Sequence, residues 1–180
     1  VNLASAPLPA SHVNGCTAYA AENGRDTVYV GATSGGTARN LYRYVINDVT
    51  APAADTWERI GGYWGSPTDS TSCAFDPVQK LFVVTGSNAL PLYYWNTATP
   101  GSKNYEVLIN LSDTNGQLLP LLQTNAITLK KCGLDFDPVQ RKYMLWCGDG
   151  RVWSISPPET ISASGWSVSL QPTPTSSVPN

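Results

Sequence analysis

The sequence contains an internal repeat with a period of about 60 residues. Phe-Asp-Pro-Val-Gln occurs at residues 75–79 and again at residues 136–140, and a basic residue follows each copy. A β-branched or aromatic stretch comes next, at residues 81–85 and 142–146. A looser third copy comes earlier, where residues 16–19 lead through a polar turn into residues 27–31.

Each copy predicts a β-hairpin, in which a short strand is joined by a polar turn to an apolar strand. Pro presets φ in such a turn and Asp bonds the backbone two residues on, so Asp76 and Asp137 are interpreted as turn residues rather than as paired catalytic carboxylates. Two further strands follow each hairpin, at residues 41–46 and 56–60, 92–95 and 104–109, and 151–155 and 165–170. Four short strands per period are typical of a β-propeller blade.

The sequence therefore predicts an all-β chain of about three propeller blades, each of four antiparallel strands. The blades are expected at residues 14–69, 70–130 and 131–171. Residues 1–13 are expected to hold the end of a preceding blade's strand and a linker, and residues 172–180 a second linker, rich in Pro, Ser and Thr.

Helices are disfavoured because Asn, Gly, Pro and Thr interrupt every stretch that is long enough. The one exception expected is residues 118–123, where Pro120 weakens the helical pattern. Aromatic residues recur at equivalent positions of the repeats, and we expect them to form the core between blades: Tyr42, Trp57, Tyr93, Trp95, Tyr105, Trp146, Trp153 and Trp166.

The repeat combines Phe-Asp-Pro, a following Lys or Arg, an aromatic strand that ends near Gly, and later strands with Tyr and Trp. Together these features resemble kelch-type repeats, which are the repeats of the galactose-oxidase-like β-propellers. The resemblance covers roughly residues 14–170. Members of that family close rings of about six or seven blades, which removes exposed sheet edges. It implies that this chain is part of a larger propeller or that copies of it complete a ring. Copper chemistry of that family needs two His and a Cys-linked Tyr, and with His12 as the single histidine it does not carry over.

Charge and hydropathy exclude several classes of function. Charged residues are 13% of the chain, the formal net charge is -2 and the isoelectric point is about 5.2, which disfavours binding to nucleic acid. The apolar stretches are too short to span a membrane. No phosphate loop, nucleophile elbow or metal motif occurs, so neither a metal nor another cofactor is expected.

Four cysteines in a chain rich in Ser, Thr and Asn suggest an extracellular or periplasmic protein. Cys132 and Cys147 lie symmetrically about the second Asp-Pro turn, so they would face each other across neighbouring strands and form a disulfide. Alternatively, they are small buried hydrophobic residues. Cys16 and Cys73 lie on inner strands of neighbouring blades, and that separation argues against a bridge between them.

Ligands of propellers generally sit over the channel mouth, which is built by the loops between second and third strands and by the connections between blades. The most suggestive loop holds Tyr63 and Trp64 between glycines, where two aromatic rings could stack on a sugar or on a protein surface. Inter-blade packing is the alternative for Trp64, and a mutual surface ion pair the alternative for Asp149 and Arg151. The polar candidates for ligand binding at this mouth are Arg39, Asp69, Asn88, Asp149 and Arg151.

The sequence thus favours a non-catalytic extracellular propeller module that recognises a glycan or a protein, or that assembles with other blades or with copies of itself. A secreted kelch-like enzyme acting on carbohydrate is the first alternative, with its catalytic residues elsewhere. A structural subunit of a surface layer or filament is the second, because low charge and open blade edges would suit subunit contacts.

Overall fold

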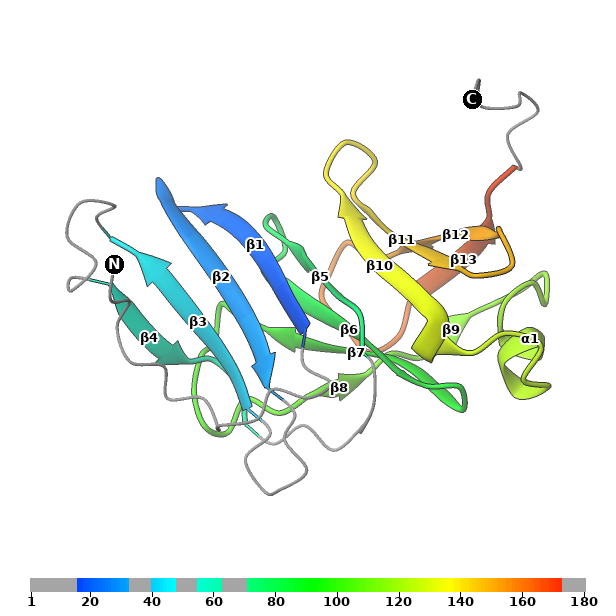
Figure 1. The fold of residues 1–180 in the computed structure, drawn as a ribbon, viewed down its shortest axis with the longest axis horizontal. Helices are drawn as coiled ribbons and strands as arrows, with labels where there is room; N and C mark the ends of the chain where they lie inside the picture. Colours follow the sequence, from blue (N-terminus) through cyan, green and yellow to red (C-terminus); the bar gives the residue numbers. More distant parts are fainter. Residues whose placement is uncertain (1–15, 33–39, 48–54, 63–70, 173–180) are drawn as a thin grey trace.

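The protein is described by a computed structural model over residues 16–32, 40–47, 55–62 and 71–172. These residues form three small β-sheets with almost no helix (Figure 1). The candidates Arg39, Tyr63, Trp64 and Asp69, His12 and both expected linkers, apart from residue 172, lie outside the described residues.

Each sheet is built from one copy of the repeat. Sheet A contains β1 (Cys16–Glu22), β2 (Arg25–Ala32), β3 (Asn40–Ile46) and β4 (Thr56–Arg59). Sheet B contains β5 (Cys73–Asp76), β6 (Leu81–Ser87), β7 (Leu90–Asn96) and β8 (Val107–Leu108). Sheet C contains β10 (Cys132–Asp137), β11 (Lys142–Cys147), β12 (Val152–Ser156) and β13 (Trp166–Leu170). The strands of each repeat pair antiparallel in chain order, which confirms the prediction of three four-stranded antiparallel units.

Sheet C gains a fifth strand that the repeat did not predict. The short strand β9 (Leu111–Ser112) follows β8 of sheet B after two residues and pairs parallel with β13. The helix α1 (Leu119–Gln123) and a 3-10 turn at Leu129–Lys131 complete the connection to β10. This helix confirms the one helical exception expected from the sequence.

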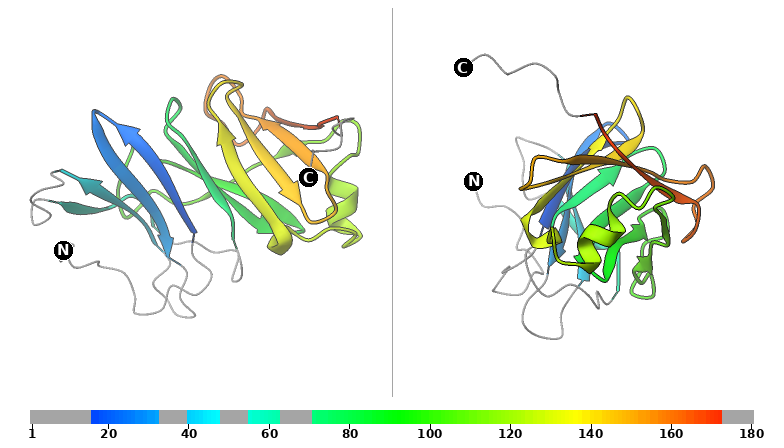
Figure 2. Two further views of the ribbon diagram at one scale, coloured as in Figure 1. Left: turned by 45° about the horizontal axis from the view of Figure 1, so that its top comes forward. Right: turned by 90° about the vertical axis from the view of Figure 1, so that its right-hand side faces the viewer.

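The first strands of the three sheets lie side by side, because β5 contacts both β1 and β10 (Figures 1 and 2). Two apolar clusters fill the spaces between the sheets. Tyr29 and Leu41 of sheet A pack with Phe82 and Trp95 of sheet B. On the other side of sheet B, Leu81, Val83 and Tyr94 pack with Tyr143, Leu145, Trp153 and Trp166 of sheet C. Burial of each such side chain contributes about 1.5–3 kcal/mol.

The repeated Asp-Pro motif is a turn, as predicted. Asp76 Oδ1 accepts hydrogen bonds from the backbone N–H of Val78 at 2.7 Å and of Gln79 at 3.1 Å. Asp137 Oδ1 accepts the equivalent pair of bonds in the second copy, at 2.8 and 3.1 Å, and these bonds lower the pKa of its carboxyl. The two copies of the motif therefore share the hydrogen bonds of a turn.

Two disulfides are present, and one of them contradicts expectation. Cys132 and Cys147 face each other across β10 and β11 with a Cα–Cα distance of 4.1 Å, which confirms the predicted bond. Cys16 and Cys73 are also bonded, at a Cα–Cα distance of 6.0 Å, so the expectation that they lie too far apart was wrong. The reason is that β1 and β5, although in different sheets, approach closely at their first residues. Two disulfides indicate an oxidising compartment.

Two of the aromatic residues expected in the core are exposed instead. Tyr105 precedes the short strand β8 and is 57% exposed, although its ring lies over Gly62, where an added Cβ would come within 3.0 Å of it. Trp146 is 45% exposed because it lies on the face of sheet C that points away from sheet B. Trp95, Trp153 and Trp166 are fully buried, as expected.

Loop length predicts the relative contribution of the two disulfides to stability. The Cys16–Cys73 bond closes a loop with a sequence separation of 57, against 15 for Cys132–Cys147, so the chain-entropy model gives about 4 and 3 kcal/mol respectively. We expect the double variant Cys16→Ala/Cys73→Ala to lose about 1 kcal/mol more unfolding free energy than Cys132→Ala/Cys147→Ala. Guanidinium denaturation of both variants measures this difference, and the reverse order would contradict it.

Candidate ligand-binding groove

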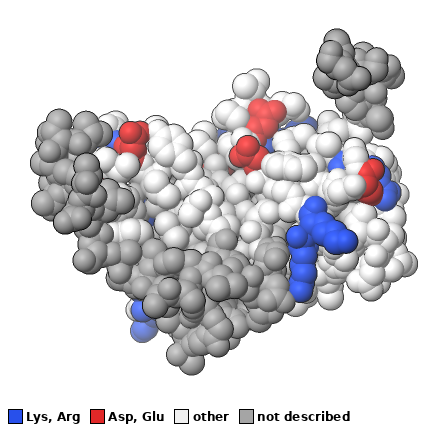
Figure 3. Space-filling model, viewed as in Figure 1, with Lys and Arg blue, Asp and Glu red and all other residues white. Residues whose placement is uncertain are grey.

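A groove of about 580 Å³ runs along the first strands of the three sheets. Its walls come from β1, β5 and β10 and from the two Asp-Pro turns. On the face seen in Figure 3, which has the orientation of Figure 1, most of the surface over these strands is uncharged. The described lining residues are Thr17, Ala18, Tyr19, Ala20, Ala21, Cys73, Ala74, Phe75, Pro77, Leu134, Asp135, Phe136 and Pro138.

Tyr19 is the most exposed aromatic residue of the lining, at 64%. Its hydroxyl donates a hydrogen bond to Asp26 Oδ1 at 2.5 Å, across the β1–β2 hairpin. This bond, with smaller effects of burial and of the Asp26 charge, raises the pKa of the Tyr19 phenol. The ring is thus held in place with one apolar face available to a ligand.

The opposite wall is set by β10. Phe136 packs edge-to-face on Tyr143 with a centroid distance of 5.0 Å, and Asp135 is exposed beside it. Asp135 is the one charged residue among the described lining residues. The groove therefore combines an apolar surface with a single negative charge.

Small side chains and sheet edges form the rest of the groove. Ala18, Ala20 and Ala74 leave the backbone close to the surface of the hollow. In addition, β1, β5 and β10 are each the edge strand of their own sheet, with one hydrogen-bonded neighbour apiece. The outer edge of such a strand presents backbone N–H and C=O groups that can pair with another chain.

The sequence-predicted residues that the structure describes lie away from this groove. Asn88 is fixed by its neighbours: its amide donates to Asn125 Oδ1 and to the carbonyl of Ile127, and its Oδ1 accepts from Leu129 N–H at 3.0 Å. It therefore fastens the β6–β7 turn to the segment before β10.

Asp149 and Arg151 form the surface ion pair that was their alternative interpretation. Arg151 Nε donates to Asp149 Oδ2 at 2.6 Å, and the guanidinium lies 5.5 Å from the ring centre of Trp153. Partial burial would raise the pKa of the Asp149 carboxyl, but hydrogen bonds from the Arg151 backbone and side chain outweigh it and lower the pKa. Arg151 thus already satisfies this carboxylate.

Asp149 nevertheless borders a second, smaller hollow of about 300 Å³ with Lys131 and residues 125–128. Because Asn88 bonds Asn125 and Ile127, the structure brings Asn88 and Asp149 to the same end of the molecule, where the sequence placed the channel mouth. However, the polar atoms of both side chains already form hydrogen bonds within the chain.

Among the described residues, no group of three or more His, Cys, Asp or Glu is placed to hold a metal. Asp113 accepts hydrogen bonds from the backbone N–H of Gln117, Leu118 and Leu119, so residues 113–116 form a turn that leads into α1.

None of the described helices is long and apolar enough to cross a membrane.

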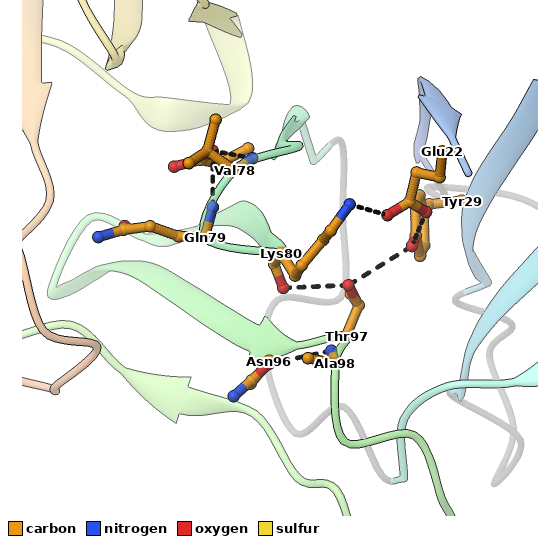
Figure 4. A network of polar contacts seen from close by, with 9 residues as sticks. Glu22, Tyr29, Val78, Gln79, Lys80, Asn96, Thr97 and Ala98 are labelled. Atoms are coloured by element: carbon orange, nitrogen blue, oxygen red, sulfur yellow. Dashed lines mark hydrogen bonds and ion pairs between the residues drawn. The ribbon is translucent and has the colours of Figure 1, made fainter. Parts of the chain in front are cut away.

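A polar network spans the interface between sheets A and B (Figure 4). Glu22, which is 7% exposed, accepts a hydrogen bond from the Tyr29 hydroxyl and forms an ion pair with Lys80 Nζ at 2.7 Å. Thr97 Oγ1 lies 3.4 Å from the Tyr29 oxygen and donates to the carbonyl of Lys80 at 3.0 Å. Because the buried carboxylate is satisfied from both sheets, this network links them and is interpreted as structural.

Comparison with known proteins adds no relative: no model of a protein family matches the chain, and no curated protein sequence shows significant similarity to it.

The Tyr29 phenol predicts a loss of stability at alkaline pH. Burial, and then the hydrogen bond to Glu22, raise its pKa to about 12, above the ordinary value of 10.0. Its contribution is complete below pH 10 and is lost as the pH rises from about 10 to 12, because the unfolded chain releases this proton first. We expect Tyr29→Phe to flatten the fall of unfolding free energy over that range. Guanidinium denaturation between pH 9 and 12 tests this, and an unchanged slope would show that Tyr29 does not titrate as described.

Proposed function

We propose that this chain is a non-catalytic β-propeller-type recognition module of an extracellular or periplasmic protein, and that its ligand is an extended segment of another protein. The observation that carries the proposal is the groove along β1, β5 and β10. Three tandem sheets of four or five strands whose first strands lie side by side support the propeller architecture. Two disulfides support the compartment.

The lining of the groove favours a peptide over a sugar. Alanine and proline side chains give shallow apolar contacts, whereas the edge strands offer backbone hydrogen bonds to an extended chain. Tyr19 supplies an exposed ring as an anchor, and Asp135 a charge that would favour a basic residue in the ligand. A sugar-binding site would need several fixed polar groups, and the described lining offers few.

The two alternatives remain predictions. A carbohydrate-active enzyme would need acids and bases that converge, but Asp149 and Arg151 pair with each other, and Arg39 and Asp69 lie outside the described residues. A structural subunit of a surface layer would use its sheet edges for contacts between copies.

Binding of displayed peptides tests the proposal. The oxidised chain is screened against a random peptide library and, in parallel, a glycan array, and the affinity of the best peptide is measured by calorimetry. We expect a peptide ligand whose Kd rises about 10- to 30-fold in Tyr19→Ala, because a central aromatic anchor is removed. Asp135→Asn should weaken binding less, and mainly at low salt.

The matched control is Leu90→Ala, since Leu90 is also exposed but lies on β7 outside the groove lining. It should bind the same peptide as tightly as the unchanged chain does. Glycan binding that depends on Tyr19 would show that the ligand is a sugar and not a protein segment. Failure of both screens would refute the recognition function. Native mass is recorded for each variant, so that a change of assembly is not mistaken for a change of affinity.

A further inference from the structure

The two faces of each sheet are distinguished by their cross-strand pairs. In sheet B, the pairs Phe82–Trp95 and Val84–Tyr93 pack against sheet A. In sheet C, the equivalent pairs Tyr143–Ile155 and Leu145–Trp153 pack against sheet B. We call this face, which is turned toward the preceding sheet, the leading face, and the opposite face the trailing face. Each internal interface joins a leading face to the trailing face of the sheet before it.

The leading face of sheet A is not covered by any described sheet. Positions in the three sheets are matched by counting residues from the turn between the first and second strands. In sheet A, the pairs equivalent to Phe82–Trp95 and Val84–Tyr93 are then Asp26–Ile46 and Val28–Tyr44. Val28 and Ile46 are half-buried, Asp26 is exposed, and Tyr19 on the same face is 64% exposed. Tyr44 is 7% exposed, like its counterpart Tyr93, because Trp57 of the same sheet packs on it with a ring-centre distance of 4.7 Å. The equivalent positions in sheets B and C, apart from Tyr93 at 7%, are at most 1% exposed. This end of the molecule therefore presents half of an interface that the chain forms twice internally.

The trailing face of sheet C is the other half. Its cross-strand pair Trp146–Val152 is equivalent to Tyr29–Arg43 in sheet A and Thr85–Leu92 in sheet B. Tyr29 and Thr85 are fully buried, but Trp146 is 45% exposed. The indole lies against Gly133, where an added Cβ would be 2.2 Å from the ring, so glycine is required beneath it.

Polar residues on the trailing face of sheet C do not argue against its use as an interface. Ser154 pairs with Met144 there and is already buried, because Gln171 Nε2 donates to its hydroxyl at 2.7 Å, and Asp135 lies nearby. The trailing face of sheet A is similarly mixed, with Glu22, Thr27 and Arg43, yet sheet B covers it. In that interface the acid is neutralised by Lys80 of the covering sheet.

We propose that a second copy of this chain covers both end faces: the leading face of sheet A in each copy packs on the trailing face of sheet C in the other. Two facts support a second copy. The contact continues an interface that the repeat already makes twice, and one chain carries both complementary halves, each with an exposed aromatic residue. A head-to-tail contact made twice closes the pair and leaves neither face open.

The dimer would also complete the groove. Tyr19 belongs both to the leading face of sheet A and to the lining of the groove, so in the dimer one side of its ring would meet the second copy and the other side would face the groove. The first strands of the second copy would therefore continue the wall that β1, β5 and β10 begin. The assembly itself does not depend on any ligand, so it can be tested apart from peptide binding.

Native mass and two surface variants test the dimer. Sedimentation equilibrium of the oxidised chain should give twice its mass of 19.3 kDa. Val28→Glu on the leading face and Trp146→Glu on the trailing face should each raise the dimer Kd at least about 30-fold, because each places a charge in an apolar contact. Val139→Glu is the matched control, since Val139 is 90% exposed at a hairpin turn and lies on neither face.

Mixing the two variants distinguishes this contact from other dimers and shows that both variants fold. A Val28→Glu copy retains a good trailing face and a Trp146→Glu copy a good leading face, so the mixture should associate although neither variant does so alone. A chain that stays monomeric at high concentration would overturn the proposal. A dimer that Trp146→Glu leaves unchanged would also overturn it, because such a dimer would join two leading faces. A ladder of growing polymers would overturn it as well, because the contact would then not close into a pair.

Discussion

Strand β5 fixes how the three sheets meet, because it contacts β1 on one side and β10 on the other. Three different bonds hold it there. The Cys16–Cys73 disulfide ties its first residue to β1, and the hydroxyl of Ser72, just before it, donates to the carbonyl of Cys132 at 2.7 Å. Beyond its last residue, Lys80 pairs with the buried carboxylate of Glu22. The interfaces, the groove and the two open end faces all follow from this alignment.

The sequence was sufficient for features that depend on near neighbours along the chain. Alternating apolar residues and the Asp-Pro turns located almost every strand, and the symmetry of Cys132 and Cys147 about a turn placed them opposite each other. The Cys16–Cys73 bond could not be predicted in this way, because it depends on how closely two separate sheets approach. The exposure of Trp146 was missed for a related reason: aromatic periodicity does not reveal which face of a sheet a neighbouring sheet covers.

The candidate site was predicted less well than the fold. Asn88, Asp149 and Arg151 were selected because polar residues in loops often bind ligands, but their hydrogen bonds are made within the chain. The groove was missed because alanine and proline have no reactive group that would identify them in a sequence. The available signal was the run of small residues on first strands, such as Ala18, Ala20 and Ala74, where a larger side chain would fill the hollow.

The parallel pairing of β9 with β13 affects how the molecule comes apart. Because the chain passes from sheet B into sheet C at this point, separating these two sheets also breaks the β9–β13 pairing. Among the described strands, none is shared by sheets A and B, and apart from the polypeptide itself the Cys16–Cys73 bond is the covalent link across their interface. After reduction, sheets A and B would therefore be joined across their interface by the apolar cluster and by non-covalent bonds such as Lys80–Glu22, whereas sheets B and C would still share the chain segment that carries β9.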